Sequence, residues 1–136
     1  MLKAVIDTNV LFEGLTTMGS CGEVVDAWVA KQFVPCVSTA LALEYEEVLT
    51  NKLGTQKSRR TLAALQALLN RATFVPIFYT VRPASPDADD DFVIDCAFNA
   101  GACIVTRNTR DFRGLKGAFG IEVFTPEAFL VRVRRS

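Results

Sequence analysis

LKAVIDTNVL, residues 2–11, sets a short apolar run directly against an aspartate. Residues 2–6 predict a buried strand, and Asp7 lies where that strand ends. A carboxylate at the edge of a core needs a partner, so Asp7 is either a cap for the turn or helix that follows or part of a site. In open sheets of parallel strands, ligands bind beyond the carboxyl ends of the strands, which is where this carboxylate is expected.

Beyond this stretch, predicted strands and helices alternate. Further strands are expected at residues 33–37, 73–81, 102–106 and 121–124, and Pro35 indicates an edge position or a bulge in the first of these. Helices are expected to begin near Ser20, at Ser38 or Thr39, near Ser58, after the aspartates of 87–91 and at Thr125. This order predicts one α/β domain over residues 1–136, a three-layer α/β/α sandwich around a central, mainly parallel twisted sheet.

The composition narrows the chemistry. The chain has 136 residues, 15 basic and 15 acidic side chains, and no histidine. A Ser-His-Asp triad, a Cys-His dyad and a histidine-ligated zinc site are therefore excluded. Any hydrolytic chemistry has to rest on carboxylates, and we expect them to bind a hard metal ion such as Mg²⁺ or Mn²⁺.

The four cysteines form no CxxC pair and lie among apolar neighbours, as buried thiols of a cytoplasmic protein do. The first residues, MLKAVID, do not form a signal peptide, and no apolar run approaches the roughly 20 residues that a membrane helix needs. We expect a cytoplasmic protein that does not enter the membrane.

Aspartates gather at the start of one predicted helix. Asp87, Asp89, Asp90 and Asp91 lie in its first turn, where the helix dipole favours acids, but three consecutive aspartates exceed what capping requires. Their mutual repulsion makes them a natural cation site, with one or two facing the crevice and the others as solvated caps. Asp95 follows one turn deeper on the same face.

Two further segments carry candidate ligands. Glu44 and Glu47 share one face of a helix, which is either solvated or the source of one inward glutamate. Asn108 and Asp111 follow strand 102–106, either as turn residues of a solvated loop or as groups at the crevice.

Four motifs follow one another in the chain: DTNVL at 7–11, LEYEEVL at 43–49, DDDF at 89–92 and IVTRNTRDF at 104–112. In this order they resemble the PIN domain, a nuclease family that includes the toxins of VapBC-type toxin–antitoxin pairs. The resemblance covers nearly the whole chain.

The resemblance implies a set of catalytic, metal-ligating acids. They fall on Asp7, on Glu44 with Glu47 as the alternative, on Asp90 with Asp89 or Asp91 as alternatives, and on the position of Asn108. Many members carry aspartate where this chain has Asn108, so Asp111 is expected to supply the missing charge. Thr8, Asn9 and Thr106 are expected to hold the carboxylates in place.

The implied function is a Mg²⁺- or Mn²⁺-dependent endoribonuclease, the toxin of a toxin–antitoxin pair. An antitoxin protein and a homodimer or higher homo-oligomer are expected as partners, and single-stranded or looped RNA as substrate. Arg107, Arg110 and Arg113, with Lys116, lie beside the predicted site and are candidates for phosphate contacts. A second basic cluster, Lys57, Arg59 and Arg60, is equally well explained as a solvated helix end.

Other functions fit less well. The amide at Asn108 leaves open a catalytically weak domain that binds RNA or protein without cutting. A phosphatase of the haloacid-dehalogenase type would need a second aspartate two positions after Asp7, where this chain has Asn9. A phosphoreceiver domain would need an acceptor aspartate after a middle strand with a paired lysine, which the chain does not offer.

Overall fold

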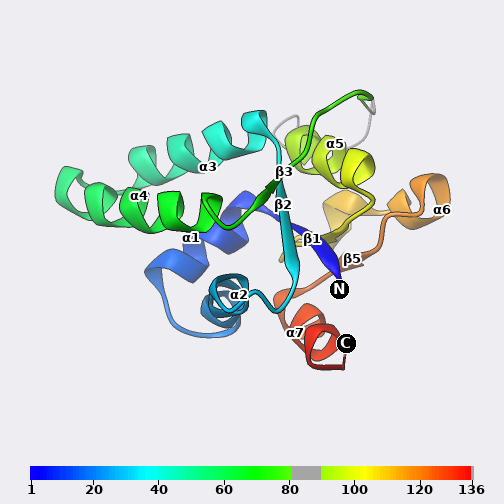
Figure 1. The fold of residues 1–136 in the computed structure, drawn as a ribbon, viewed down its shortest axis with the longest axis horizontal. Helices are drawn as coiled ribbons and strands as arrows, with labels where there is room; N and C mark the ends of the chain where they lie inside the picture. Colours follow the sequence, from blue (N-terminus) through cyan, green and yellow to red (C-terminus); the bar gives the residue numbers. More distant parts are fainter. Residues whose placement is uncertain (81–89, 136) are drawn as a thin grey trace.

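The computed structural model describes residues 1–80 and 90–135, with the side chain of Asp90 outside that description. Its sheet consists of β1 (Lys3–Ile6), β2 (Val34–Val37), β3 (Thr73–Phe74), β4 (Cys103–Val105) and β5 (Val123–Phe124). The strand order is β3-β2-β1-β4-β5, and every pair of neighbouring strands is parallel (Figure 1). The predicted fold class, a parallel sheet within an α/β sandwich, is confirmed.

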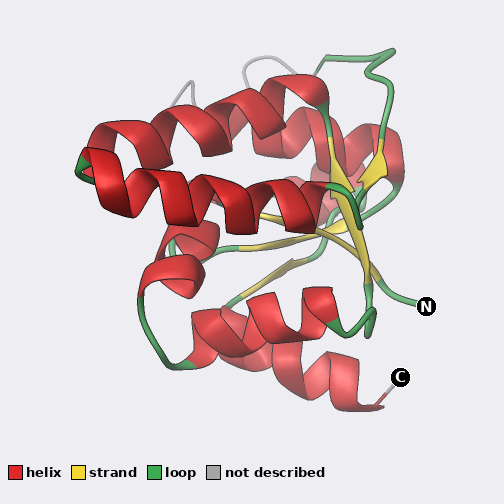
Figure 2. Cartoon of the chain, turned by 60° about the vertical axis from the view of Figure 1, so that its left-hand side comes forward, coloured by secondary structure: helices red, strands yellow, loops and turns green. Residues whose placement is uncertain are grey.

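Helices cover both faces of this sheet. On one side lie α2 (Ser20–Val29) and α7 (Pro126–Arg135), and on the other α3 (Thr39–Lys52), α4 (Thr55–Leu69) and α5 (Asp90–Ala100) (Figures 1 and 2). Short elements complete the chain: α1 (Thr8–Thr16), the 3₁₀ turn η1 (Thr109–Phe112) and α6 (Leu115–Phe119). Among the described helices, none is both long enough and apolar enough to cross a membrane.

The core on the α2 and α7 side is built on aromatic packing. Phe33 lies edge-on to Phe129 with ring centroids 5.0 Å apart, and Trp28 lies edge-on to Phe33 at 6.3 Å. The indole Nε1 of Trp28 donates to the carbonyl of Leu68 at 2.9 Å, which ties α2 to the end of α4. All four cysteines are buried and free, as the sequence predicts.

Pro35 lies in β2, an inner strand between β3 and β1, and pairs in register with Ala4. The edge position or bulge that the sequence indicated is therefore wrong. The amide of Val34 donates to the carbonyl of Leu2 beside β1, so the nitrogen of Pro35 faces the opposite side, toward β3. There β3 begins only opposite Cys36, one residue later. The missing N–H of Pro35 therefore costs the sheet no hydrogen bond.

Three predicted elements differ from the structure. The strand expected over 73–81 is reduced to Thr73–Phe74: after Val75 donates to Val37, residues 75–80 leave the sheet. The amides of Phe78 and Tyr79 donate instead to the side chain of Asn99. Residues 20–23 have the Ser-x-x-Glu pattern of a capping box, but Ser20 is the first residue of α2, and Gly19 before it makes no side-chain cap bond. Helix α4 begins at Thr55, three residues before the expected Ser58.

Candidate functional site

Asp7 is the centre of the candidate site. Its side chain is 8% exposed at the carboxyl end of β1, and Oδ1 accepts a hydrogen bond from the amide of Thr8 at 2.8 Å. Oδ2 accepts from the hydroxyl of Thr106 at 2.7 Å. Asp7 also caps α1, so the positive end of the helix dipole supports its negative charge. Capping and site membership are thus compatible, because a carboxylate has about four lone-pair positions.

Thr106 joins the ends of three neighbouring strands. It follows β4, is fully buried, and its amide donates to the carbonyl of Phe124 in β5 at 2.9 Å. Its hydroxyl donates to Asp7 and accepts from the amide of Asn108 at 3.0 Å. One threonine therefore fixes the carboxylate after β1 and the loop after β4. Asn9, the third residue expected to hold the carboxylates, is exposed in the first turn of α1.

Tyr45, on the buried face of α3, is a part of the site region that sequence reasoning did not identify. Its hydroxyl donates to the carbonyl of Ile6 at 2.5 Å, directly before Asp7. Burial, and further the negative charges around it, including that of Asp7, raise the pKa of Tyr45 well above its ordinary value. The hydroxyl is therefore a permanent donor that fastens α3 to the end of β1.

α3 brings Glu44 rather than Glu47 toward the interior. Ser38 caps this helix by accepting from the amide of Leu41 at 3.1 Å, and the helix packs against α1 and α5. Glu44 is half-buried, whereas Glu47 is exposed. Burial thus favours Glu44 as the inward glutamate of the two.

α5 packs against β1, β2, β4 and α3, which places its acids on the same side of the sheet as Glu44. Asp91 is half-buried with Oδ1 shielded from solvent, and Asp95 is 6% exposed. Asp87 and Asp89 lie outside the described residues, and Asp90 is described only as the first residue of the helix. Within the described part of the chain, no group of three or more His, Cys, Asp or Glu side chains is close enough to hold a metal ion.

The loop after β4 pairs Asn108 with Asp111. The amide Nδ2 of Asn108 donates to Oδ2 of Asp111 at 2.5 Å, and the backbone amide of Asp111 donates to the carbonyl of Asn108 at 3.2 Å. Asp111 thus lies beside Asn108, the position where many family members carry an acid, and one of its oxygens is hydrogen-bonded to the side-chain amide of Asn108.

Arg107 differs from the other basic residues of this segment. Its Nε donates to Oε2 of Glu13 at 2.6 Å, and its Nη1 lies 3.5 Å from Oε2 of Glu127. The thiol of Cys21 donates to the same oxygen of Glu13 at 2.8 Å, and these contacts, with that of Cys21 the larger, lower the pKa of Glu13. Arg107 therefore joins α1 to α7 although it is exposed, whereas Arg110 and Arg113, which are also exposed, line a hollow beside β5.

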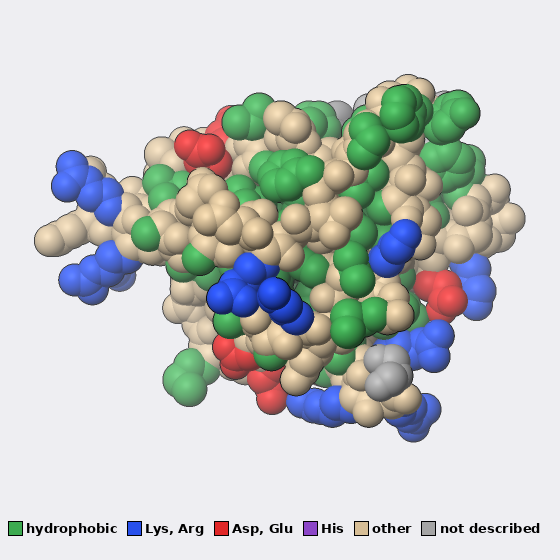
Figure 3. Space-filling model, in the orientation of Figure 1, with side chains coloured by type: hydrophobic (Ala, Val, Ile, Leu, Met, Phe, Trp, Pro, Cys, Tyr) green, Lys and Arg blue, Asp and Glu red, His purple; other side chains and the backbone are tan. Residues whose placement is uncertain are grey.

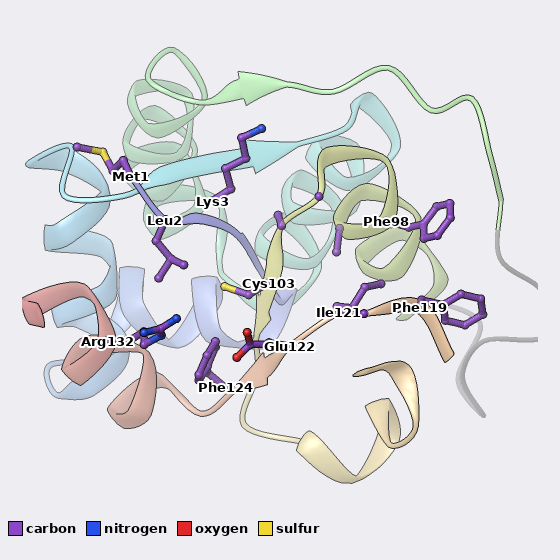
Figure 4. A pocket seen from close by; sticks show the side chains of 14 residues that line it. Met1, Leu2, Lys3, Phe98, Cys103, Phe119, Ile121, Glu122, Phe124 and Arg132 are labelled. Atoms are coloured by element: carbon purple, nitrogen blue, oxygen red, sulfur yellow. The ribbon is translucent and has the colours of Figure 1, made fainter. Parts of the chain in front are cut away.

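A second hollow, of about 440 Å³, lies at the opposite, amino-terminal ends of β1 and β4. Figure 4 shows Phe98 and Phe119 at one end of it and Arg132 at the other. Glu122 is the only acid among its lining residues in the described chain. It offers no pair of carboxylates, so the candidate site stays at the carboxyl ends of the strands.

The chain is similar to known proteins in sequence family and in fold. A family model described as "PIN domain" matches residues 3–110. Among solved structures, DNA-bound VapBC from Salmonella typhimurium is similar with a TM-score of 0.64 and 18% identity, over 93% of this chain and 99% of that one. FitAcB from Neisseria gonorrhoeae is similar with a TM-score of 0.63 and 18% identity, over 91% and 98% of the two chains. No curated protein sequence matches.

Proposed function

The chain belongs to the PIN domain family, and from this premise we propose that it is a metal-dependent endoribonuclease, the toxin of a toxin–antitoxin pair. The observation that carries the proposal is the setting of Asp7: a buried carboxylate at the carboxyl end of β1, held by Thr8 and Thr106. The carboxyl ends of parallel strands are also where open α/β sheets bind their ligands.

The proposed ligands are Asp7, Glu44, Asp90 and Asp111, with Asp89, Asp91 or Asn108 as substitutes. All of them offer oxygen as the donor atom, and a site made only of oxygen donors favours Mg²⁺ or Mn²⁺ over Zn²⁺. The buried oxygens of Asp7 and the shielded Oδ1 of Asp91 fit such an ion. When bound, the ion would supply positive charge that activates water and offsets the negative charge of the phosphodiester.

The chain's own residues would hold the carboxylates in place. Thr106 and the amide of Thr8 keep Asp7 in one orientation. Tyr45 fixes α3, and with it Glu44, relative to the end of β1. Preorganised carboxylates of this kind reduce the reorganisation needed when substrate binds.

RNA and the protein partners are the further parts of the proposal. Single-stranded or looped RNA is favoured because an unstacked strand can enter a crevice that a duplex cannot. An antitoxin partner is supported by the structural likeness to VapBC and FitAcB. We also propose a homodimer or higher homo-oligomer, a cytoplasmic location and a single domain spanning residues 1–136.

The test is RNA cleavage by the purified chain with Mn²⁺, compared with Asp7→Asn. We expect cleavage to fall at least 100-fold, by analogy with the loss of one essential electrostatic group. Asp26→Asn, which removes a charge from the exposed side of α2, is the control and should cleave normally. Cleavage that survives Asp7→Asn would point to a contaminating nuclease and end the assignment.

A second pair of variants tests the choice on α3. Glu44→Gln should lose cleavage, whereas Glu47→Gln, one turn away and exposed, should keep it. The reverse result would move the ligand to Glu47. The amide of Asn108 favours one competing function, a domain that binds RNA or protein without cutting. Tight RNA binding with no cleavage at any Mn²⁺ concentration would favour that function.

A further inference from the structure

A hollow of about 500 Å³ lies beside β5, between η1 and the start of α6. Three cationic side chains line it, Arg110, Arg113 and Lys116, and its apolar wall includes Ile121 and Val123. Its described lining contains no acid. In a chain whose net charge is zero, this is a local concentration of positive charge.

Among the residues that the structure describes, no acid forms a salt bridge with any of these three cations. In residues 1–80 and 91–135, the salt bridges involve other cations, and Arg107 of the same segment is held by Glu13 and Glu127. Asp111, the acid nearest in sequence, accepts a hydrogen bond from Asn108. Three like charges around one hollow repel one another, and an anion bound between them would relieve that repulsion.

The chemistry of the lining selects the anion. Two guanidinium groups present paired N–H donors that match the oxygens of a phosphate, and Lys116 adds a mobile third charge. The apolar wall gives a sugar or base a surface to lie on. The hollow also belongs to the segment that starts at Asn108, whose amide is bonded to Thr106 and so to Asp7.

We propose that this hollow binds a backbone phosphate of the RNA strand, away from the bond that is cut. This inference rests on the proposed function for the identity of the strand. It assigns substrate contact to Arg110, Arg113 and Lys116, and assigns Arg107 to the scaffold.

The test measures RNA affinity without metal. Fluorescence anisotropy of a labelled single-stranded RNA 12-mer, with the full chain in EDTA, compares wild type with the triple variant Arg110→Gln/Arg113→Gln/Lys116→Gln. The matched control is Lys57→Gln/Arg59→Gln/Arg60→Gln, which removes three exposed cations from α4. Figure 3 shows Lys and Arg side chains projecting over the turn between α3 and α4, at the opposite end of the molecule from α6.

We expect the hollow variant to weaken binding at least 10-fold. The slope of log affinity against log salt should also become shallower, by about 0.7 for each phosphate that the variant no longer neutralises. The α4 control and Arg107→Gln should change affinity less than 2-fold. Equal losses in both triple variants would show only a general charge effect and would overturn the proposal, as would no loss in either. Competition by polyglutamate as effective as by RNA would also overturn it, since a carboxylate polymer would then serve equally well.

The outcome separates this inference from the nuclease assignment. If Asp7→Asn abolishes cleavage while the hollow variant cleaves and binds like wild type, the hollow is not a phosphate site and the nuclease assignment stands. If wild type never cleaves but binding depends on the hollow, the phosphate site stands without the nuclease. Circular dichroism melting of each variant checks that the exposed substitutions leave the fold intact, and the single variant Lys116→Gln should give a smaller loss in the same direction.

Discussion

The hydroxyl of Thr106 donates to Oδ2 of Asp7 at 2.7 Å, across 99 residues of sequence. The bond joins the ends of β1 and β4, two strands that pair in parallel from Ala4–Cys103 to Ile6–Val105. Because both side chains are buried, the carboxylate depends on this donor for its orientation and for part of its solvation.

Thr106→Val keeps the shape of the side chain and removes the donor. We expect a loss of about 1–3 kcal/mol in the free energy of unfolding, since a buried carboxylate loses a hydrogen bond. Cleavage should fall as well, whereas Thr106→Ser should keep most of both. Urea unfolding measures the first effect. A double variant with Asp7→Asn that loses the full sum of the two single effects would show that the residues are not coupled.

Tyr45→Phe removes the hydroxyl that fastens α3 to the carbonyl of Ile6. We expect a loss of about 1 kcal/mol in stability, together with reduced cleavage, because Glu44 is no longer held as firmly. Tyr79→Phe, on a side chain that is 68% exposed, is the control and should change neither. Unaltered thermal melting and cleavage in Tyr45→Phe would remove this tyrosine from the site.

Stability should fall at alkaline pH. Burial raises the pKa of Cys96 and of Cys103 to about 12 from an ordinary value of 9.0. Below pH 9 the thiols are protonated in both the folded and the unfolded chain, so the free energy of unfolding keeps its full value. Between pH 9 and 12 the thiols ionise more readily in the unfolded chain, and the free energy of unfolding therefore falls as pH rises. Each thiol adds at most about 1.4 kcal/mol per pH unit to this loss.

The corresponding measurement is urea unfolding between about pH 8 and about pH 11, which spans the ordinary thiol pKa. Cys96→Ala should be less stable at the lower pH because of the cavity it leaves, but its stability should decline less steeply with pH. Identical slopes for wild type and variant would mean that this thiol ionises as readily in the folded as in the unfolded chain.

Mn²⁺ should raise the melting temperature of the wild-type chain, because an ion that binds only the folded state stabilises it. At about 100 times its dissociation constant, the gain is about 2.7 kcal/mol. Asp7→Asn should remove most of this gain, and Asp26→Asn none of it. A rise of the same size in all three proteins would place the ion elsewhere. Scanning calorimetry with and without EDTA provides the comparison.

The part of the candidate site that follows strand ends could be predicted from the sequence. Asp7 and Thr106 follow apolar runs, and parallel strands bring such residues to one edge of the sheet. The helix pattern alone leaves Glu44 and Glu47 open, because both share one face, and only the family resemblance ranked Glu44 first. In the structure Glu44 is half-buried and Glu47 is exposed.

Other features depend on tertiary contacts that leave no local pattern. Residues 75–80 have strand-like composition, yet Asn99 takes up the amides of Phe78 and Tyr79 that a neighbouring strand would otherwise bind. The hydrogen bond from Tyr45 to Ile6 joins residues 39 positions apart, and no local sequence pattern indicates it. The same is true of Arg107, whose partners Glu13 and Glu127 lie on two distant helices.

The buried cysteines have a practical consequence for labelling. With a pKa of about 12, on the order of one in 100,000 of the Cys96 and Cys103 side chains is thiolate at pH 7, and thiolate is the form that reacts with maleimide. Cys21 and Cys36 are buried as well, each with a raised pKa. A single cysteine introduced by Lys116→Cys would therefore be the preferred site of modification in the native chain. A dye or cross-linker attached there would sit on the rim of the basic hollow with all four natural cysteines left in place.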